Sequence, residues 1–305
     1  MTERNFRSNI KAAVDKVRAE NPMAPSITNT VTQDFVANAQ LAVGGSAAMV
    51  YLPDEGETMA QIAPAMYLNL GTVMPFYAET IPRTLRALQK NRKPFVLDPV
   101  AIGIGALRTE LLTQMKNFKP SIIRGNASEI ISLAKLWGLS SKGGNVRGVD
   151  STDNVDAAKI PAVELARFTE GAVAISGAED LITDGKIFLY SSGGSARLPK
   201  ITGSGCSLGG VMAIYAAVTD PLTAALTATA IYNCAASRAE KTTDAPASFK
   251  VKFLDELFKI KSSEVAANPL KITVIRHTDS MLGVSQAEGL KEAITKSRQH
   301  AEATK

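Results

Sequence analysis

KITGSGCSLGGVMAIY, residues 200–215, contains a glycine-rich turn that runs directly into an apolar segment with the character of a buried helix. Glycines such as Gly203 and Gly205 allow a tight turn and close approach of a ligand. The free N–H groups of a first helical turn, together with the helix dipole, favour a phosphate. The same dipole lowers the pKa of a thiol, which predicts that Cys206 favours the thiolate form. The alternative is a packing turn in which Cys206 is a small buried hydrophobic residue.

Short apolar runs alternate with helical patterns around this turn. Strands are predicted at residues 47–51, 65–70, 95–97, 121–124 and 172–176, with shorter candidates at 181–183 and 187–190. Helices are predicted at residues 55–62, 75–91, 127–137, 157–168, 201–219 and 221–237. This alternation predicts an α/β fold, with a mostly parallel sheet that carries helices on both faces. The last short strands predict an antiparallel edge.

The chain shows no linker long enough to separate two domains. We therefore expect a single domain over residues 1–262. Residues 263–305 are rich in Lys, Glu and Ala, with a strand-like patch at 272–275 and a terminal helical pattern, and are predicted to form an appendage of unknown role. Residues 201–219 and 221–237 carry no charge, but they are built from Ala, Gly and Thr and are split by Asp220. They are interpreted as two closely packed buried helices rather than as a membrane hairpin.

The composition restricts the classes of function. A net charge of +5 and a pI of about 9.1 suit a polyanionic small molecule such as ATP, whereas 6% aromatic residues and the lack of a dense Lys/Arg block argue against nucleic acid. The two histidines, His277 and His300, leave little for a His-rich metal site or a Ser-His-Asp triad. The charged N-terminus has no apolar segment of a secretory signal, and two cysteines without CxxC spacing favour a reducing compartment, which predicts a cytoplasmic protein.

Polar residues follow several predicted strands, where an open parallel sheet binds its ligands. Asp98 ends the strand FVL, and its carboxylate either holds a metal or polar substrate group or simply forms an Asp-Pro turn with Pro99. Arg124 ends the next strand, in a position to contact phosphates. Ser176 ends the strand AVAIS, where a hydroxyl can reach a nucleotide.

Two readings of Asn126 and Glu129 stay open. Their spacing is that of a capping box, in which Asn126 caps the helix and Glu129 stands at the third helical position. In the functional reading Glu129 acts on Mg²⁺ through water. Further towards the N-terminus, Asn29 and Met49 lie in TNTVTQDFVANAQLAVGGSAAMVY, residues 28–51, and taken alone they are a cap or turn residue and a core residue.

These segments, in this order, resemble the hydroxyethylthiazole kinase family, which has a ribokinase-like fold. The resemblance covers about residues 27–257. It rests on TNTVTQDFVANAQLAVGGSAAMVY (28–51), LNLGT (68–72), VLDPV (96–100), IRGNASEI (123–130), GVDS (148–151), AISGAED (174–180) and ITGSGCSL (201–208), with a weaker match at ASF (247–249).

The resemblance implies a reaction in which ATP and 4-methyl-5-(2-hydroxyethyl)thiazole give ADP and the thiazole phosphate, in thiamine salvage. It also implies Mg²⁺ and a homotrimer that binds the thiazole at its subunit interfaces, without nucleic acid or membrane as a partner. The implied roles are catalysis for Cys206, substrate binding for Met49, Asn29 and Gly203, ATP binding for Arg124, Ser176 and Gly205, and metal binding for Asp98 and Glu129.

The resemblance also implies a role for the cysteine. Most ribokinase-like enzymes place an aspartate there as a base, whereas the thiazole kinases have cysteine. Because phosphoryl transfer has a loose transition state, positioning and charge stabilisation matter more than deprotonation of the alcohol. We therefore hypothesise that Cys206 orients or deprotonates the hydroxyethyl group while the helix N-terminus stabilises the phosphoryl oxygens.

The chain departs from the family pattern at three places near ligands. Pro25-Ser26-Ile27 stands where a cysteine is usual, Ala101 stands where glycine is commoner, and APASF replaces a GPGSF-type motif at 245–249. Two alternatives therefore remain: a kinase for a related alcohol such as hydroxymethylpyrimidine, and a non-catalytic paralogue that binds a thiazole or a nucleotide. A hydrolase with a cysteine nucleophile is disfavoured, because no histidine lies near Cys206 in the sequence.

Overall fold

The computed structural model describes residues 2–139 and 155–275. Met1–Ile272 forms one compact unit, and the second unit, Thr273–Lys305, is described only over residues 273–275. The GVDS segment at 148–151 and the predicted terminal helix lie outside the described residues. The compact unit therefore extends past the predicted boundary at residue 262.

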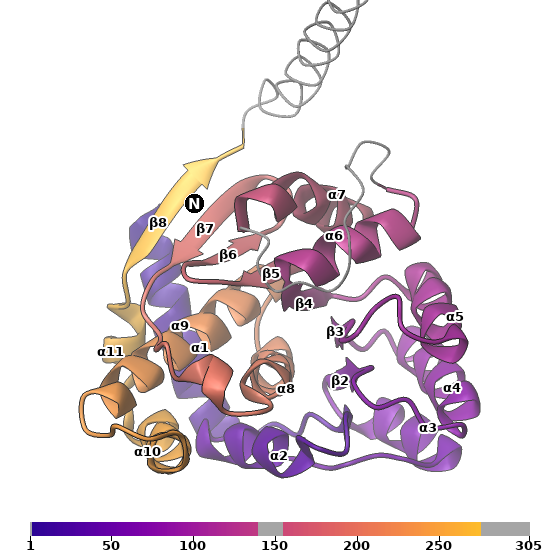
Figure 1. The fold of residues 1–305 in the computed structure, drawn as a ribbon, viewed down its shortest axis with the longest axis horizontal. Coiled ribbons are helices and arrows are strands. Elements are labelled where there is room, and N and C mark those ends of the chain that lie inside the picture. Colours follow the sequence, from indigo (N-terminus) through magenta and orange to yellow (C-terminus); the bar gives the residue numbers. More distant parts are fainter. Residues whose placement is uncertain (1, 140–154, 276–305) are drawn as a thin grey trace, which may run out of the picture. The chain divides into compact units, whose positions relative to one another are not determined.

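One sheet, with its strands in chain order from β1 to β8, forms the centre of the described fold (Figure 1). The first five strands run parallel, and β6 and β7 are antiparallel to their neighbours. This confirms the predicted parallel sheet with an antiparallel edge. The strands are β1 Ser26–Ile27, β2 Met66–Asn69, β3 Phe95–Asp98, β4 Ile122–Asn126, β5 Ala172–Ser176, β6 Asp180–Thr183, β7 Ile187–Ser191 and β8 Leu270–Val274.

Helices cover both faces of the sheet, and neighbouring residues of each strand point to opposite faces. On β2, Tyr67 packs into the core with α1, α2, α8 and α9, whereas Met66 and Leu68 pack into a second core with α4, α6 and α7. The α-helices are α1 Glu3–Glu20, α2 Gln33–Ala42, α3 Pro53–Ile62, α4 Tyr77–Lys90, α5 Ala106–Met115, α6 Ala127–Leu136, α7 Lys159–Thr169, α8 Ser204–Ala216, α9 Pro221–Glu240, α10 Pro246–Lys259 and α11 Ser262–Ala266.

The first strand differs from the prediction. The apolar run at 47–51 is not a strand, because the segment 46–49 meets the β1 region only through isolated bridges, Met23 to Ser46 and Ser26 to Met49. The strand is the short β1, in which Ser26 donates its amide to Ala48 and accepts one from Val50. Hydrophobicity favoured the wrong segment, since β1 follows a proline and contains only one apolar residue.

The segment after residue 262 packs on the compact unit. Val265 of α11 is buried in the core, and the guanidinium of Arg7 on α1 donates to the carbonyl oxygens of Ala266 and Asn268. Residues 263–272 therefore pack with the compact unit.

The two charge-free segments form α8 and α9, and both are buried. Asp220 ends the loop between them and caps α9, since its side chain accepts the amide of Thr223 at 3.0 Å. Within the described ranges, no helix is long and apolar enough to cross a membrane. The interpretation of two closely packed buried helices is confirmed by the core that α8 and α9 share.

Gly209 allows α8 to lie close to β2. A Cβ at this position would lie 2.5 Å from Cε2 and 2.7 Å from the hydroxyl oxygen of Tyr67, closer than packed atoms approach. We expect Gly209→Ala to lower the free energy of unfolding by about 1–3 kcal/mol through overpacking, measured by urea denaturation. Ser8→Ala, at an exposed position of α1, is the control and should change it by less than about 0.5 kcal/mol. A Gly209→Ala protein as stable as the wild type would contradict this packing.

Candidate active site

Polar side chains gather where β2 to β5 end, beside the N-terminus of α8. The strand register sets them side by side, with Asn69 of β2 opposite Asp98 of β3 and Asn126 of β4 opposite Ser176 of β5. This is the edge at which a parallel α/β sheet binds ligands. The predicted positions of Asp98 and Ser176 at strand ends are confirmed. Arg124 was predicted to end its strand, but β4 continues for two residues to Asn126, so Arg124 lies within the strand.

The carboxylate of Asp98 is fully buried and hydrogen-bonded on one side only. Its Oδ2 accepts from the Tyr67 hydroxyl at 2.9 Å, from Nδ2 of Asn69 at 3.0 Å and from Nη1 of Arg124 at 3.3 Å. Its Oδ1 has no partner among the described residues. Burial raises the pKa of Asp98, and the charge of Arg124 opposes that rise. A turn-forming Asp-Pro does not need this set of donors, so the geometry favours the ligand-binding reading.

Arg124 is the cation at the centre of the site. Its Nη2 donates to Oγ of Ser176 at 2.9 Å, and its Nε is buried without a partner among the described residues. Burial lowers its pKa, but the carboxylates of Asp98 and Glu129 outweigh that effect and raise the pKa, so the guanidinium stays charged. A Cβ on Gly205 would lie 2.5 Å from Nη1, so the guanidinium lies directly against the first turn of α8. Two positive groups side by side form a site for an anion.

The capping box at the start of α6 is present. The amide of Asn126 donates to Oε2 of Glu129 at 2.9 Å, and the amide of Glu129 donates to Oδ1 of Asn126 at 2.8 Å. The structural reading is therefore confirmed, but it does not exhaust the role of Glu129. Burial raises its pKa, and the charge of Asp98 raises it further. Two carboxylates thus share one guanidinium.

Cys206 lies in the first turn of α8, with its thiol buried against Asn29. Nδ2 of Asn29 lies 3.5 Å from Sγ, within the range of a hydrogen bond to sulfur. Burial raises the pKa of Cys206 above its ordinary value of 9.0, and the charge of Asp98 raises it further. The direction of this shift runs against the predicted thiolate, because burial and the neighbouring carboxylate both disfavour a negative charge on the sulfur.

Gly203 precedes α8 in the left-handed conformation, with φ of 87°. A Cβ here would lie 2.7 Å from Cγ2 of Thr32, so both the backbone and the packing require glycine. Met49, by contrast, is not part of the hydrogen-bonded group in the described residues. It is half-buried beside β1, where it bridges with Ser26.

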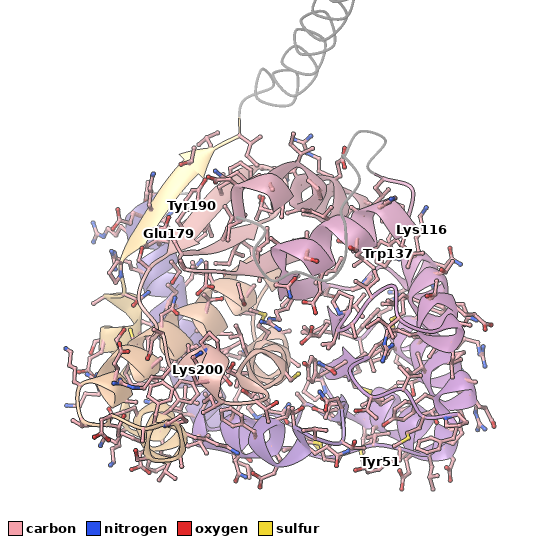
Figure 2. The ribbon with its side chains drawn as sticks, viewed as in Figure 1. Tyr51, Lys116, Trp137, Glu179, Tyr190 and Lys200 are labelled. Atoms are coloured by element: carbon pink, nitrogen blue, oxygen red, sulfur yellow. The ribbon has the colours of Figure 1, made fainter. Side chains whose placement is uncertain are left out.

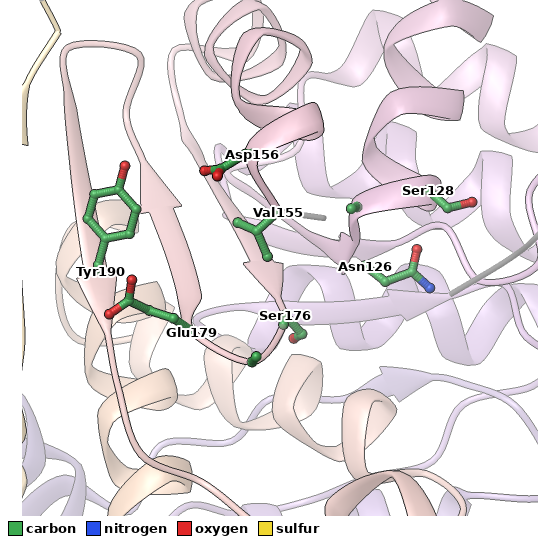
Figure 3. A pocket seen from close by; sticks show the side chains of 10 residues that line it. Asn126, Ser128, Val155, Asp156, Ser176, Glu179 and Tyr190 are labelled. Carbon is green, nitrogen blue, oxygen red and sulfur yellow. The ribbon is translucent and has the colours of Figure 1, made fainter. Parts of the chain in front are cut away.

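A cavity of about 390 Å³ adjoins Ser176 (Figure 3). Tyr190 and Glu179 lie on one side of it, and Asn126 and Ser128 on the other. Figure 2 also places Glu179 and Tyr190 close together, on the side of the sheet formed by β6 and β7. Its lining is Asn126, Ala127, Ser128, Val155, Asp156, Ser176, Gly177, Ala178, Glu179 and Tyr190.

Sequence reasoning missed several of these residues. Asn69 stands at a strand end like Asp98, and that position was the signal that could have identified it. Tyr67 looks like a core residue within an apolar run, and only the structure shows that its hydroxyl donates to Asp98. No group of three or more His, Cys, Asp or Glu suited to a metal occurs in residues 2–139 and 155–275.

The sequence profile of the hydroxyethylthiazole kinase family matches residues 14–263. This chain belongs to that family. The hydroxyethylthiazole kinase of Bifidobacterium adolescentis is 48% identical over 277 residues, which cover 87% of this chain and 94% of the relative. The recognition made on the sequence motifs is thereby confirmed.

Solved structures agree with the family and the fold. The hydroxyethylthiazole kinase protein of Pyrococcus horikoshii superposes with a TM-score of 0.78 at 29% identity, covering 87% of this chain and 98% of that chain. A ribokinase-like superfamily protein of Enterococcus faecalis superposes with a TM-score of 0.57 at 12% identity, covering 82% of this chain and 94% of that chain. At that identity the likeness shows the fold alone, which is the predicted ribokinase-like α/β fold.

The protonation state of Cys206 can be measured. Because only the thiolate is alkylated, the rate for Cys206 should rise with pH through a midpoint above 9.0. The measurement is the iodoacetamide rate against pH in Cys234→Ser protein, in which Cys206 is the sole cysteine. The same protein in urea, where the shift is absent, is the control. A folded-state rate that levels off below pH 8 would show that the thiolate is favoured after all.

Proposed function

We propose that this chain transfers a phosphoryl group from ATP to the hydroxyl of 4-methyl-5-(2-hydroxyethyl)thiazole, giving ADP and the thiazole phosphate for thiamine salvage. The observation that supports this best is the charged Arg124 held against the first turn of α8, next to the pair formed by Cys206 and Asn29. An anion site adjoining a site for a neutral alcohol is what the reaction requires. The family membership supplies the identity of the alcohol.

The nucleotide occupies the side of the site formed by β4 and β5. Arg124 and Ser176 contact its phosphates, and the cavity of about 390 Å³ beside Ser176 takes the rest of the molecule. The transferring phosphoryl group lies at the start of α8, where Gly205 leaves the backbone N–H groups and the guanidinium of Arg124 close together. These donors stabilise the charge of the phosphoryl oxygens in the transition state.

The thiazole occupies the side formed by Asn29, Gly203, Cys206 and Met49. Since the thiol of Cys206 is protonated, it orients the alcohol through hydrogen bonds and is not a preformed strong base. The hydroxyl oxygen forms the new bond to phosphorus as the bond to ADP breaks, and the alcohol proton passes to an oxygen of the transferred phosphoryl group or to water. A loose transition state needs little help from a base, so orientation and charge stabilisation carry the catalysis.

The acidic residues suit Mg²⁺. Oδ1 of Asp98 is buried and unpartnered among the described residues, and burial raises the pKa of both Asp98 and Glu129, which share one cation. Mg²⁺ is bound in nucleotide sites by one or two carboxylates, by water and by phosphate oxygens. Asp98 and Glu129 would hold it, directly or through water. When bound it neutralises phosphate charge.

A homotrimer with interfacial thiazole sites fits the surface around the acceptor side. Val31, two residues after Asn29, is 71% exposed, and Leu52, three residues after Met49, is 51% exposed. These exposed apolar side chains are available to contact another subunit beside the ligand site. In such a trimer Met49 would line a thiazole pocket that is shared between two subunits. We place the reaction in the cytoplasm, where thiols stay reduced, with neither nucleic acid nor membrane as a partner.

The first test is ADP release from Mg-ATP with hydroxyethylthiazole, with hydroxymethylpyrimidine and without an acceptor. ADP should form only with the thiazole, because the alcohol must be oriented at Cys206 before transfer. Release with the pyrimidine instead would identify a kinase for a related alcohol. A folded protein that binds ATP but releases no ADP with either alcohol would be the non-catalytic paralogue.

Replacement of the thiol tests its role in orientation. Cys206→Ala should lower kcat by about 10- to 100-fold with little change in the KM for ATP, since a misplaced acceptor mainly affects the chemical step. The matched control is Cys234→Ala, which alters the other cysteine, outside the site on α9. Turnover of Cys206→Ala equal to that of the wild type would remove Cys206 from the mechanism.

A further inference from the structure

The loop at residues 69–72, which follows β2, connects the two halves of the site. At its start, Nδ2 of Asn69 donates to Asp98, and Oδ1 of Asn69 accepts the amide of Gly71 at 2.9 Å. At its end, Oγ1 of Thr72 lies 3.5 Å from Oγ1 of Thr30. Asn69 itself is held in the β2–β3 ladder opposite Asp98, so a displacement of the residues after it would reach the acceptor side of the site first.

Gly71 lies directly behind the side chain of Asn29. A Cβ on Gly71 would lie 2.6 Å from Nδ2 and 2.7 Å from Cβ of Asn29. The Asn29 amide is thus packed between the backbone of the loop on one side and Sγ of Cys206 on the other. The position of Asn29 depends on the position of the loop backbone, because neighbouring groups in a packed interior move together.

Arg108 of α5 hydrogen-bonds to the backbone of this loop. Its Nε donates to the carbonyl of Leu70 at 2.9 Å, its Nη2 donates to the carbonyl of Gly71 at 3.0 Å, and its Nη1 donates to the carbonyl of Ile104. Within residues 2–139 and 155–275 these are backbone contacts, and Arg108 forms no ion pair. A planar guanidinium presents its donors from three nitrogens in fixed directions, which matches three separate carbonyl oxygens, whereas the three donors of an ammonium group radiate from a single nitrogen.

We propose that Arg108 is a positioning residue for the acceptor alcohol. It fixes the 69–72 loop, the loop fixes the Asn29 amide, and the amide fixes the thiol of Cys206 at which the alcohol is oriented. The inference rests on the proposed function, since it assigns Asn29 and Cys206 to the acceptor side. It goes beyond that function by adding a residue that touches neither substrate. The contacts of Arg108 do not reach Ser176 or the cavity beside it, so nucleotide binding should be spared.

The kinetic test compares Arg108→Met and Arg108→Lys with the wild type. Both variants should raise the KM for the thiazole and lower kcat, with about a tenfold or greater loss of kcat/KM for the thiazole and a KM for ATP within about twofold of the wild type. The control is Arg83→Met on α4, which removes an arginine that pairs with Glu57 and Glu79 on another surface. An unchanged KM for the thiazole in both Arg108 variants, or an equal loss for both substrates, would overturn the proposal.

A second readout does not require kinase activity. In a Cys234→Ser background, Arg108→Met should raise the alkylation rate of Cys206 by about threefold or more, because the Asn29 amide no longer covers the sulfur. Arg83→Met should leave that rate unchanged. Circular dichroism and unfolding midpoints identify a variant that fails to fold, and Arg108→Lys then provides the measurement. Unchanged alkylation in folded Arg108 variants overturns the proposal, whereas a wild type without thiazole-dependent ADP release overturns the proposed function alone.

Discussion

The buried guanidinium of Arg124 is the group around which the site is arranged. A buried ion pair with Asp98 contributes little net stability, because the cost of removing both charges from water offsets their attraction. The surroundings are nonetheless adapted to it: Ser176 accepts one of its N–H groups, Gly205 leaves it room, and Tyr67 and Asn69 hold Asp98 in place. Its Nε and Oδ1 of Asp98 stay unpartnered among the described residues. An arrangement that leaves buried polar atoms open is explained by ligands better than by stability.

The same charges decide the state of the thiol. The N-terminus of α8 favours an anion, but a thiolate at Cys206 would place a third negative charge beside Asp98 and Glu129, with one guanidinium to balance them. The protonated thiol leaves the positive end of the helix available to a phosphoryl group. The chemistry then depends on where the alcohol is held, and so on the loops that hold it.

Strand ends could be predicted from the sequence where an apolar run is followed by a polar residue, as at Asp98 and Ser176. At Arg124 the same pattern misleads, because β4 continues to Asn126. The capping box of Asn126 and Glu129 follows from spacing alone. The other features of the fold and the site depend on contacts between segments that lie far apart in the sequence. Tyr67 resembles any core aromatic residue, the short β1 has no apolar run of its own, and no spacing rule connects Arg108 to Asn29. The raised pKa of Cys206 could not be predicted either, because it depends on burial of the thiol and on the charge of Asp98 on another strand.

The two sides of the site are thus built on different supports. The nucleotide side rests on β4 and β5, whose ladder fixes Arg124 and Ser176 within a rigid sheet. The acceptor side rests on loops, which are held by contacts such as those of Arg108. The loop after β3, beside the two carboxylates, carries backbone strain. Ala101, where the family more often has glycine, has a φ of 57°, which costs a residue with a side chain about 1–2 kcal/mol. Its backbone hydrogen-bonds to Glu129. Ala101 adopts this left-handed conformation although it is not a glycine. The contact with Glu129 therefore constrains the loop more strongly than local backbone preference does.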